Sequence, residues 1–261
     1  PGSNLVSILP MAHMYGLAVE FLFGFINGCH LYFLNRMPSP SLIAEAFAEV
    51  KPRLIVAVPL VIEKIIRRKV LAEVQTNRMK LLLNMPVINK KIKQHIRDRI
   101  MEAFGGNAFE IIVGGAPLNQ GIEEFLNSVG VPVTIGYGTT ETAPLITFAN
   151  YDKYKIASCG PVVDHMEAKV VSPDPANVPG ELIARGMNVM LGYYKNEEAT
   201  NAVLDKDGWF HTGDLATMAP SGHIYIKGRI KNMLLGANGQ NVYPEEIEDK
   251  LNNMPLVGES I

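Results

Sequence analysis

Short apolar runs alternate with longer helical stretches along the first half of the chain. The runs have the length of buried strands and cover Leu5–Leu9, Cys29–Leu34, Leu54–Val58, Phe109–Val113 and Val131–Ile135. Between them, apolar residues recur with the spacing of an amphipathic helix. Strands and helices that alternate in this way predict βαβ units and a mostly parallel sheet.

The helical stretches have recognisable starts and breaks. Met14–Asn27 reads as a mostly apolar helix, and Ser41 is a candidate N-cap for the next helix. The stretch 60–104 is long and basic, and Pro86 should divide it into two helices. Asn119 is the predicted N-cap of a later helix, which lies between two of the predicted strands.

The pattern changes after about Cys159, where short alternating runs are separated by Gly, Pro, Asn and Asp. The runs are Glu167–Val171, Glu181–Arg185, Asn188–Leu191 and His223–Lys227. They predict a β-rich lobe, a small barrel or a sandwich. The segment 208–214 contains the only Trp and interrupts this pattern.

Composition excludes several classes of protein. The chain has 261 residues, 48% hydrophobic and 19% charged, with a net charge of -2, which is ordinary for a soluble globular protein and gives no sign of nucleic-acid binding. No apolar run is long enough to cross a bilayer. Cys29 and Cys159 are too far apart in sequence to suggest a zinc site or a disulfide framework, so a reducing, cytoplasmic location is expected.

The basic stretch 63–104 has more than one interpretation. A solvated helix face is favoured. A surface for an acidic partner, a peripheral contact with a membrane, or a contact with the phosphates of a large cofactor stays open. The sequence does not indicate an oligomeric state.

The segment Gly136–Thr142 combines two glycines, an aromatic ring, three hydroxyls and one carboxylate. It follows one predicted strand, and Gly114–Pro117 follows the neighbouring one, so both should meet at the carboxyl edge of the sheet, where ligands bind in open parallel sheets. The glycines allow close approach of the backbone, the Tyr137 ring can stack on a flat ligand, and Glu141 suits Mg²⁺. We therefore expect an anionic, ring-bearing ligand, with a metal ion.

Several separated blocks resemble, in the family's order, the adenylate-forming superfamily of acyl-CoA synthetases, luciferases and peptide-synthetase adenylation domains. They are Leu9–His13, Gly136–Thr142, Gly208–Asp214 and Gly228–Lys231. Within the superfamily, Pro59–Ile65 and the basic stretch after it are most similar to long-chain fatty-acid CoA ligases. The resemblance implies part of the adenylate-forming enzyme fold: an α/β sheet-and-helix lobe of the large domain at 1–157, its β-rich lobe at 158–228, and the beginning of a small C-terminal α+β domain at 229–261.

The resemblance also implies a role for individual residues. Nucleotide binding falls to Gly114, Gly115 and Ala116 beside adenine, Tyr137 and Gly138 on its ring, Thr140 at phosphate, and Asp214 and Arg229 at the ribose. Glu141 would hold Mg²⁺, His13 and Gly136 would line the acyl pocket, and Lys231 would mark the hinge to the small domain. Thr140, Glu141 and Lys231 are thus the candidate catalytic residues.

Each of these residues has a plainer explanation when it is taken alone. A His after a strand is usually structural, Gly114–Ala116 could be a simple turn, and the Tyr137 ring could pack in a core. The Thr140–Glu141 pair resembles an ordinary helix start. The segments 180–182 and 186–193, with Thr200, are interpreted as structural.

The reaction implied by the resemblance joins a fatty acid to CoA through an acyl-AMP, with ATP and Mg²⁺. The family's phosphate loop lies upstream of these blocks and its catalytic lysine downstream, and neither stretch is present, so this chain alone should be nearly inactive. Alternatives are an adenylating enzyme for an aryl or amino acid, or a catalytically silent nucleotide-binding module. A dinucleotide-binding oxidoreductase is disfavoured because no predicted strand is followed by G-x-G-x-x-G.

Overall fold

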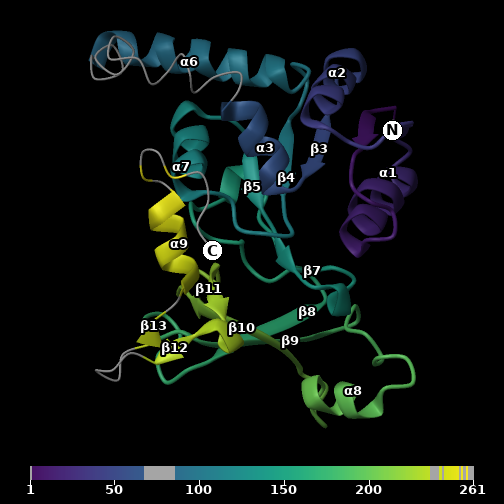
Figure 1. Cartoon of the computed structure of the whole chain (residues 1–261), viewed down its shortest axis with the longest axis vertical. Coiled ribbons are helices and arrows are strands. Elements are labelled where there is room, and N and C mark those ends of the chain that lie inside the picture. Colours follow the sequence, from purple (N-terminus) through teal and green to yellow (C-terminus); the bar gives the residue numbers. More distant parts are fainter. Residues whose placement is uncertain are drawn as a thin grey trace. The chain divides into compact units, whose positions relative to one another are not determined.

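The fold comes from a computed structural model that describes residues 2–67, 86–235, 241–242, 244–252, 254 and 257. Contacts divide the chain into two compact units, Pro1–Ile135 and Gly136–Ile261, and each is described separately. Figure 1 traces both units. The predicted domain limits at 157/158 and 228/229 concern the whole protein and stay predictions.

The first unit is built on a five-stranded sheet in the order β2-β1-β3-β4-β5. The strands are β1 (Asn4–Ser7), β2 (His30–Phe33), β3 (Leu54–Ala57), β4 (Glu110–Val113) and β5 (Val133–Ile135). Every neighbouring pair is parallel. The predicted parallel sheet is therefore confirmed, and each strand matches one of the apolar runs.

Helices connect these strands, as the alternating pattern predicts. They are η1 (Gly16–Leu22), α1 (Phe23–Ile26), α2 (Pro40–Val50), α3 (Pro59–Ile66), α6 (Pro86–Ala103) and α7 (Gln120–Val129). Helix α2 contacts α3 and α6, and α6 contacts α7 (Figure 1). The π-helix η1 contacts β1. Phe47, Ile66, Ile100 and Phe104 are fully buried where these helices pack.

The helix ends confirm most of the predicted signals and correct one of them. Asn119 caps α7, since its side chain accepts a hydrogen bond of 3.1 Å from the Ile122 amide, and α6 begins at Pro86 as predicted. The prediction that Ser41 caps the second helix is wrong. The cap is Ser39, which has an extended backbone because Pro40 follows it, and the proline occupies the first turn. The middle of the basic stretch, 68–85, lies outside the described residues.

The second unit contains an antiparallel sheet in the order β11-β10-β9-β8. Its strands are β8 (Met166–Val171), β9 (Gly180–Gly186), β10 (Phe210–Met218) and β11 (Ile224–Arg229). Smaller ladders join β6 (Tyr137–Gly138) to β7 (Leu145–Thr147) and β12 (Leu234–Leu235) to β13 (Asn241–Val242). The remaining elements are η3 (Thr140–Thr142), η4 (Tyr151–Lys153), α8 (Glu197–Val203), η5 (Ile230–Asn232) and α9 (Pro244–Asn252).

Three expectations for this β-rich part need correction. Strands β8 to β11 form one open sheet rather than a barrel or sandwich among the described residues. The segment 188–191 is an irregular turn, because its polar groups bond to another turn instead of a strand. The motif 208–214 does not interrupt the sheet: β10 begins at Phe210 within it, and the β9–β10 register shifts between His211 and Leu215. The irregular ladder there gives Asp214 its position.

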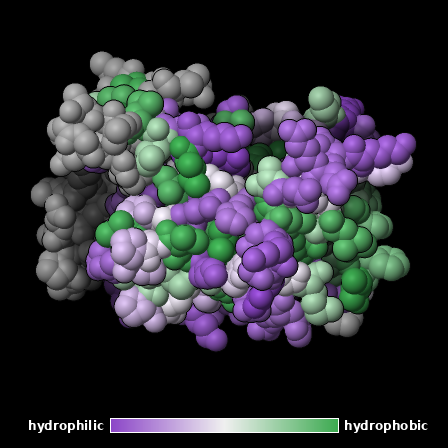
Figure 2. All heavy atoms as spheres, turned by 90° about the horizontal axis from the view of Figure 1, so that it is seen from below, coloured by the Kyte–Doolittle hydropathy of each residue, from purple (hydrophilic) through white to green (hydrophobic). Residues whose placement is uncertain are grey.

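The described surface mixes apolar and polar residues. Among the described residues, no helix is long and apolar enough to cross a bilayer. The face in Figure 2 mixes hydrophobic and hydrophilic residues, which is normal because more than half of a protein's surface is apolar.

Candidate functional site

A short hairpin and turn shape the segment 136–142 that the sequence singles out. Gly138 has to be a glycine, because a Cβ would lie 1.7 Å from the Pro144 carbonyl oxygen. The turn after it closes on itself: the Thr139 amide donates to the Thr142 hydroxyl oxygen over 3.1 Å, and that hydroxyl lies 2.8 Å from the Pro144 carbonyl oxygen. Thr142 is fully buried. The expected helix start is thus a single 3-10 turn with a capping box.

This turn presents the two candidate phosphate and metal residues. Thr140 is exposed and Glu141 is half-buried. The Tyr193 hydroxyl donates to Glu141 Oε1 over 2.8 Å, and the Met190 amide donates to the Glu141 carbonyl oxygen over 2.7 Å. Partial burial, and then the bond to Glu141, raises the pKa of Tyr193, so its hydroxyl keeps its proton and acts as the donor.

The most strongly buried acid of the site is Asp214, which is only 5% exposed. The Tyr137 hydroxyl donates to its Oδ2 over 2.5 Å, and Arg229 Nε donates to its Oδ1 over 3.0 Å. Asp214 and Arg229 are direct partners in the β10–β11 ladder, which explains their pairing. Burial, followed by the negative charge of Asp214, raises the pKa of Tyr137 well above its usual value, so the phenol stays protonated.

The Tyr137 ring also packs against a buried core cluster of the antiparallel sheet, whose members are Val170, Leu182, Ala216 and Ile224. Core packing, the alternative that the sequence left open for Tyr137, therefore applies to part of the ring. Its role beside adenine stays a prediction. The packing fixes the ring, and with it the direction of the hydroxyl that bonds to Asp214.

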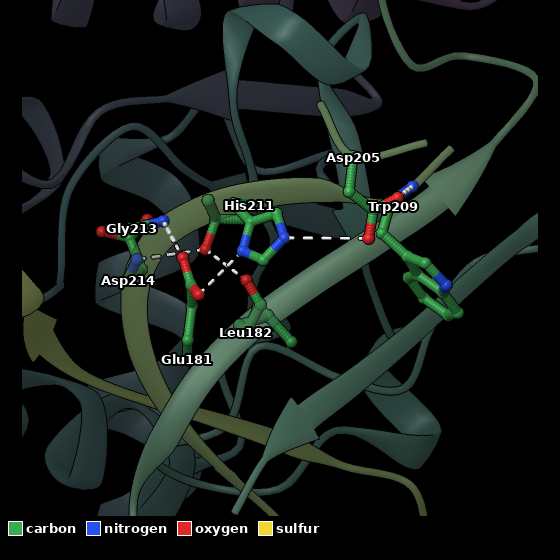
Figure 3. A network of polar contacts seen from close by, with 8 residues as sticks. Glu181, Leu182, Asp205, Trp209, His211, Gly213 and Asp214 are labelled. Atoms are coloured by element: carbon green, nitrogen blue, oxygen red, sulfur yellow. Dashed lines mark hydrogen bonds and ion pairs between the residues drawn. The ribbon is translucent and has the colours of Figure 1, made fainter. Parts of the chain in front are cut away.

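A network around Glu181 holds the backbone that carries Asp214 (Figure 3). Glu181 Oε1 accepts from the Gly213 amide over 3.3 Å, and Oε2 lies 2.9 Å from Nδ1 of His211. On the far side of the imidazole, Nε2 lies 3.9 Å from Asp205, whose pKa is lowered chiefly by the hydrogen bond from the Trp209 amide. These contacts join β9 to the β10 segment just before Asp214.

The first unit carries the other predicted residues. His13 is exposed, and its Nδ1 accepts from the Tyr15 amide over 3.1 Å, so the neutral ring carries its proton on Nε2. Gly114 packs on Tyr15, since a Cβ there would come within 3.1 Å of the phenol ring. Gly115 has a φ of +85°, which favours glycine. Gly115 and Ala116 are both exposed.

A buried carboxyl lies behind the loop that carries His13. Glu20 is fully buried, and its oxygens accept from the Ser7 hydroxyl over 2.9 Å and from the Ile8 and Leu9 amides over 3.1 Å each. Burial outweighs these bonds and raises the pKa of Glu20 to about 7.

The structure thus brings together Tyr137, Asp214 and Arg229, while Thr140 and Glu141 lie on the turn that follows Tyr137. Lys231 is exposed in η5, just after Arg229. Gly136 begins the second unit, and its added Cβ would meet the Leu145 side chain at 3.3 Å. His13 and Gly114–Ala116 belong to the first unit, so their meeting with Tyr137 stays a prediction.

Four polar residues with several bonding partners are absent from the sequence-based candidates: Glu20 in the first unit, and Glu181, Asn188 and Tyr193 in the second. Their partners lie far away in the sequence, so no local spacing identifies them. Only Glu20 gives a signal, as the one acidic residue in an otherwise apolar helix. A buried acid in such a helix needs hydrogen-bond partners.

The predicted Mg²⁺ role of Glu141 concerns an ion that arrives with a ligand bringing its own oxygens. The described residues contain no group of three or more His, Cys, Asp or Glu that could hold a metal. Glu141 is therefore a single carboxylate, which fits Mg²⁺, because this ion is usually held by one or two carboxylates plus substrate phosphates.

The parallel βαβ unit, the buried Asp214 beside a tyrosine and an arginine, and the threonine-rich turn agree with the resemblance to adenylate-forming enzymes. Residues 1–194 match the AMP-binding enzyme family. The chain belongs to this family.

Similar proteins support the same class. The long-chain-fatty-acid–CoA ligase of Escherichia coli O6:H1 is 34% identical over 99% of this chain and 42% of its own length. The ligase ACSBG2 of Gallus gallus is 29% identical over 98% of this chain and 37% of its own. The chain thus spans about two-fifths of the length of these relatives.

Solved structures agree on the fold. O-succinylbenzoate CoA synthetase of Bacillus subtilis, in complex with AMP, has a TM-score of 0.76 and 25% identity, covering 98% of this chain and 47% of its own. ATP-bound MatB of Rhodopseudomonas palustris has a TM-score of 0.75 and 27% identity, covering 99% of this chain and 46% of its own. The predicted fold class is confirmed.

Proposed function

We propose that this chain carries the adenylate-binding part of a long-chain fatty-acid–CoA ligase. In the first step, a carboxylate oxygen of the fatty acid attacks the α-phosphorus of ATP; the bond to the β-phosphate breaks and pyrophosphate leaves. In the second step, the CoA thiol loses its proton and attacks the acyl carbonyl, and AMP leaves. No side chain is needed as a nucleophile, because both steps pass directly between substrates.

The observation that carries this proposal is the cluster of Asp214, Tyr137 and Arg229. A buried carboxylate suits the two neighbouring hydroxyls of a ribose, since one carboxylate group can accept several hydrogen bonds. The guanidinium of Arg229 donates to Asp214 through Nε, and its side chain is 62% exposed, so further N–H groups of the fork can point to a phosphate. The Tyr137 ring would lie beside adenine, with Gly138, and Gly114, Gly115 and Ala116 would approach its other side.

The turn after Tyr137 supports the phosphate end. The exposed Thr140 hydroxyl would donate to a phosphate oxygen, and Glu141 would hold Mg²⁺. Mg²⁺, when bound, neutralises charge on the phosphate oxygens. This assignment is supported by the similar synthetase of Bacillus subtilis, which has been solved with ATP and a magnesium ion (TM-score 0.75, 25% identity).

The remaining parts of the proposal rest on the family. His13 and Gly136 would line the acyl pocket, and Lys231, in η5 directly after Arg229, would mark the hinge to the small domain. CoA is the proposed acceptor of the acyl group. A cytoplasmic location goes with this proposal and is supported by two free cysteines, which are normal in a reducing compartment.

The fatty acid is supported by the named relatives, and one observation favours a second candidate. The similarity to O-succinylbenzoate CoA synthetase, at a TM-score of 0.76, points to an aryl acid instead. A fatty acid and an aryl acid would pass through the same adenylation step. The two candidate functions would differ in the pocket that receives the acyl group.

Pyrophosphate release by the full-length protein tests the proposal. The acids would be hexadecanoate, o-succinylbenzoate and a set of amino acids, each with ATP, Mg²⁺ and CoA. We expect release with hexadecanoate, together with formation of its CoA thioester. Release with only an aryl or amino acid would refute the fatty-acid assignment. Binding of AMP without release for any acid would indicate a catalytically silent module.

A further inference from the structure

The turn that carries Glu141 is held by a second segment of the chain, residues 188–193. Four hydrogen bonds join the two. Asn188 Nδ2 donates to the carbonyl oxygens of Thr142 over 2.6 Å and Leu145 over 2.9 Å. The Met190 amide donates to the Glu141 carbonyl oxygen over 2.7 Å. Three of these bonds hold the backbone of the turn, and the fourth, from Tyr193, reaches the Glu141 side chain itself.

Tyr193 is in turn fixed by its own neighbours. Its amide donates to the Thr200 hydroxyl over 2.9 Å, and Thr200 Oγ1 donates to the Asn196 carbonyl oxygen over 2.8 Å. Gly192 has a φ of +149° and no room for a side chain, since a Cβ would lie 2.9 Å from Thr200. The hydrogen bonds through Thr200 anchor the backbone of Tyr193, whose hydroxyl bonds to Glu141.

The contact leaves a definite orientation for the carboxylate. Tyr193 donates to Oε1 over 2.8 Å, which restrains the rotamer of the Glu141 side chain. A half-buried glutamate on a short turn has several rotamers, and fixing one of them spares the entropy that metal binding would otherwise cost. Partners of this kind commonly orient metal ligands, and their loss weakens metal binding about 10- to 100-fold in well-built sites.

We propose that Tyr193 is a positioning residue for Glu141, and that its hydroxyl holds the carboxylate in the orientation that receives the Mg²⁺ of a bound nucleotide. This inference rests on the proposed function. It assigns a role to the segment 186–193, which the sequence alone suggests is merely structural.

The test uses Tyr193→Phe, which removes one hydroxyl and keeps the ring. Isothermal titration would measure ATP affinity of the full-length protein at a series of Mg²⁺ concentrations, and AMP affinity without metal. We expect the Mg²⁺ concentration at half-effect to rise by roughly five- to tenfold, because the loss is one hydrogen bond to a charged group. AMP affinity should stay within about twofold, since the adenosine contacts are unchanged.

The neighbouring Tyr194→Phe is the matched control, because this tyrosine is 88% exposed and its ring faces Lys195 instead of Glu141. It should leave both affinities unchanged. In a Glu141→Gln background, Tyr193→Phe should add no further effect, because the group that it orients is gone. Thermal unfolding of each variant would show that the fold is retained.

The outcomes separate the two proposals. If the wild type binds AMP and Mg·ATP, and Tyr193→Phe leaves the Mg²⁺ dependence unchanged, the positioning role is refuted and the proposed function stands. An equal loss of AMP and Mg·ATP affinity in Tyr193→Phe would also refute it, because the tyrosine would then act on the whole site. If the wild type binds no adenine nucleotide, the proposed function fails and this inference fails with it.

Discussion

The substitution Glu20→Gln should remove the pH dependence that this buried acid, which accepts three hydrogen bonds, gives to the stability of the first unit. Burial raises the pKa of Glu20 to about 7 from its ordinary value of about 4.5. Below pH 4.5, both the folded and the unfolded chain carry the proton. Between pH 4.5 and 7, only the folded chain keeps it, so the stability contributed by this group falls as the pH rises.

The size of the effect follows from the shift. Raising the pKa of Glu20 from about 4.5 to about 7 corresponds to about 3 kcal/mol of lost folding stability, reached in full above the folded-state pKa. Gln does not titrate, so its contribution should not change with pH, although its NH2 group cannot accept the hydrogen bond that one of the two backbone amides donates to the acid. The stability of the variant relative to the wild type should therefore rise by up to about 3 kcal/mol between pH 4.5 and pH 8.

Denaturant-dependent hydrogen exchange of peptides from β1 and α2 measures the free energy of unfolding of the first unit. Both elements belong to that unit, so unfolding of the second unit does not interfere. The rates would be corrected for intrinsic exchange at each pH. The difference between the variant and the wild type removes the contribution of all other titrating groups. A variant that is less stable by the same amount at every pH would refute the reasoning, because the hydrogen bonds would then outweigh the burial of the charge.

Three further changes act on the second unit. Gly138→Ala should prevent the β6–β7 ladder, since the Cβ would lie 1.7 Å from a carbonyl oxygen, and hydrogen exchange of that hairpin should then become fast; slow exchange would contradict this. Asn188→Ala should cost about 2–3 kcal/mol of local stability by leaving two carbonyls without their donor, which exchange at the Glu141 turn would detect. Glu181→Ala should weaken AMP binding roughly tenfold by releasing the Gly213 amide and His211, and calorimetry showing unchanged affinity would refute that.

The first unit was largely predictable from the sequence. Its strands are buried on the sheet and stand out as continuous apolar runs, and Asn119 has the spacing of an N-cap. The error at Ser41 was local: two serines flank Pro40, and only the one before the proline has the extended backbone that a cap requires. Such a choice depends on backbone angles that composition does not fix.

The second unit shows the limits of pattern reading. Strand β10 contains Gly213, and its register with β9 shifts between His211 and Leu215. The polar residues in this part of the strand do not alternate with apolar ones, so the sequence does not predict a strand there. Residues 188–191 alternate like a strand but bond to the Glu141 turn. Family motifs singled out Asp214, Tyr137 and Arg229 as candidate nucleotide contacts, but their bonds to one another come from the structure. Tyr193 and Glu181 bond to residues far away in the sequence, which no motif spans. Contacts between residues far apart in the sequence can be identified only once the fold is known.

AMP titration of the full-length protein tests the central claim most directly. Asp214 is held by Tyr137 and Arg229, and the account assigns the ribose to this carboxylate. Asp214→Ala should weaken AMP binding by roughly 10- to 100-fold, and Tyr137→Ala by a similar factor, since each removes charged or stacking contacts worth about 1.5–3 kcal/mol. AMP affinity that is undiminished in both variants would contradict the assignment of this site.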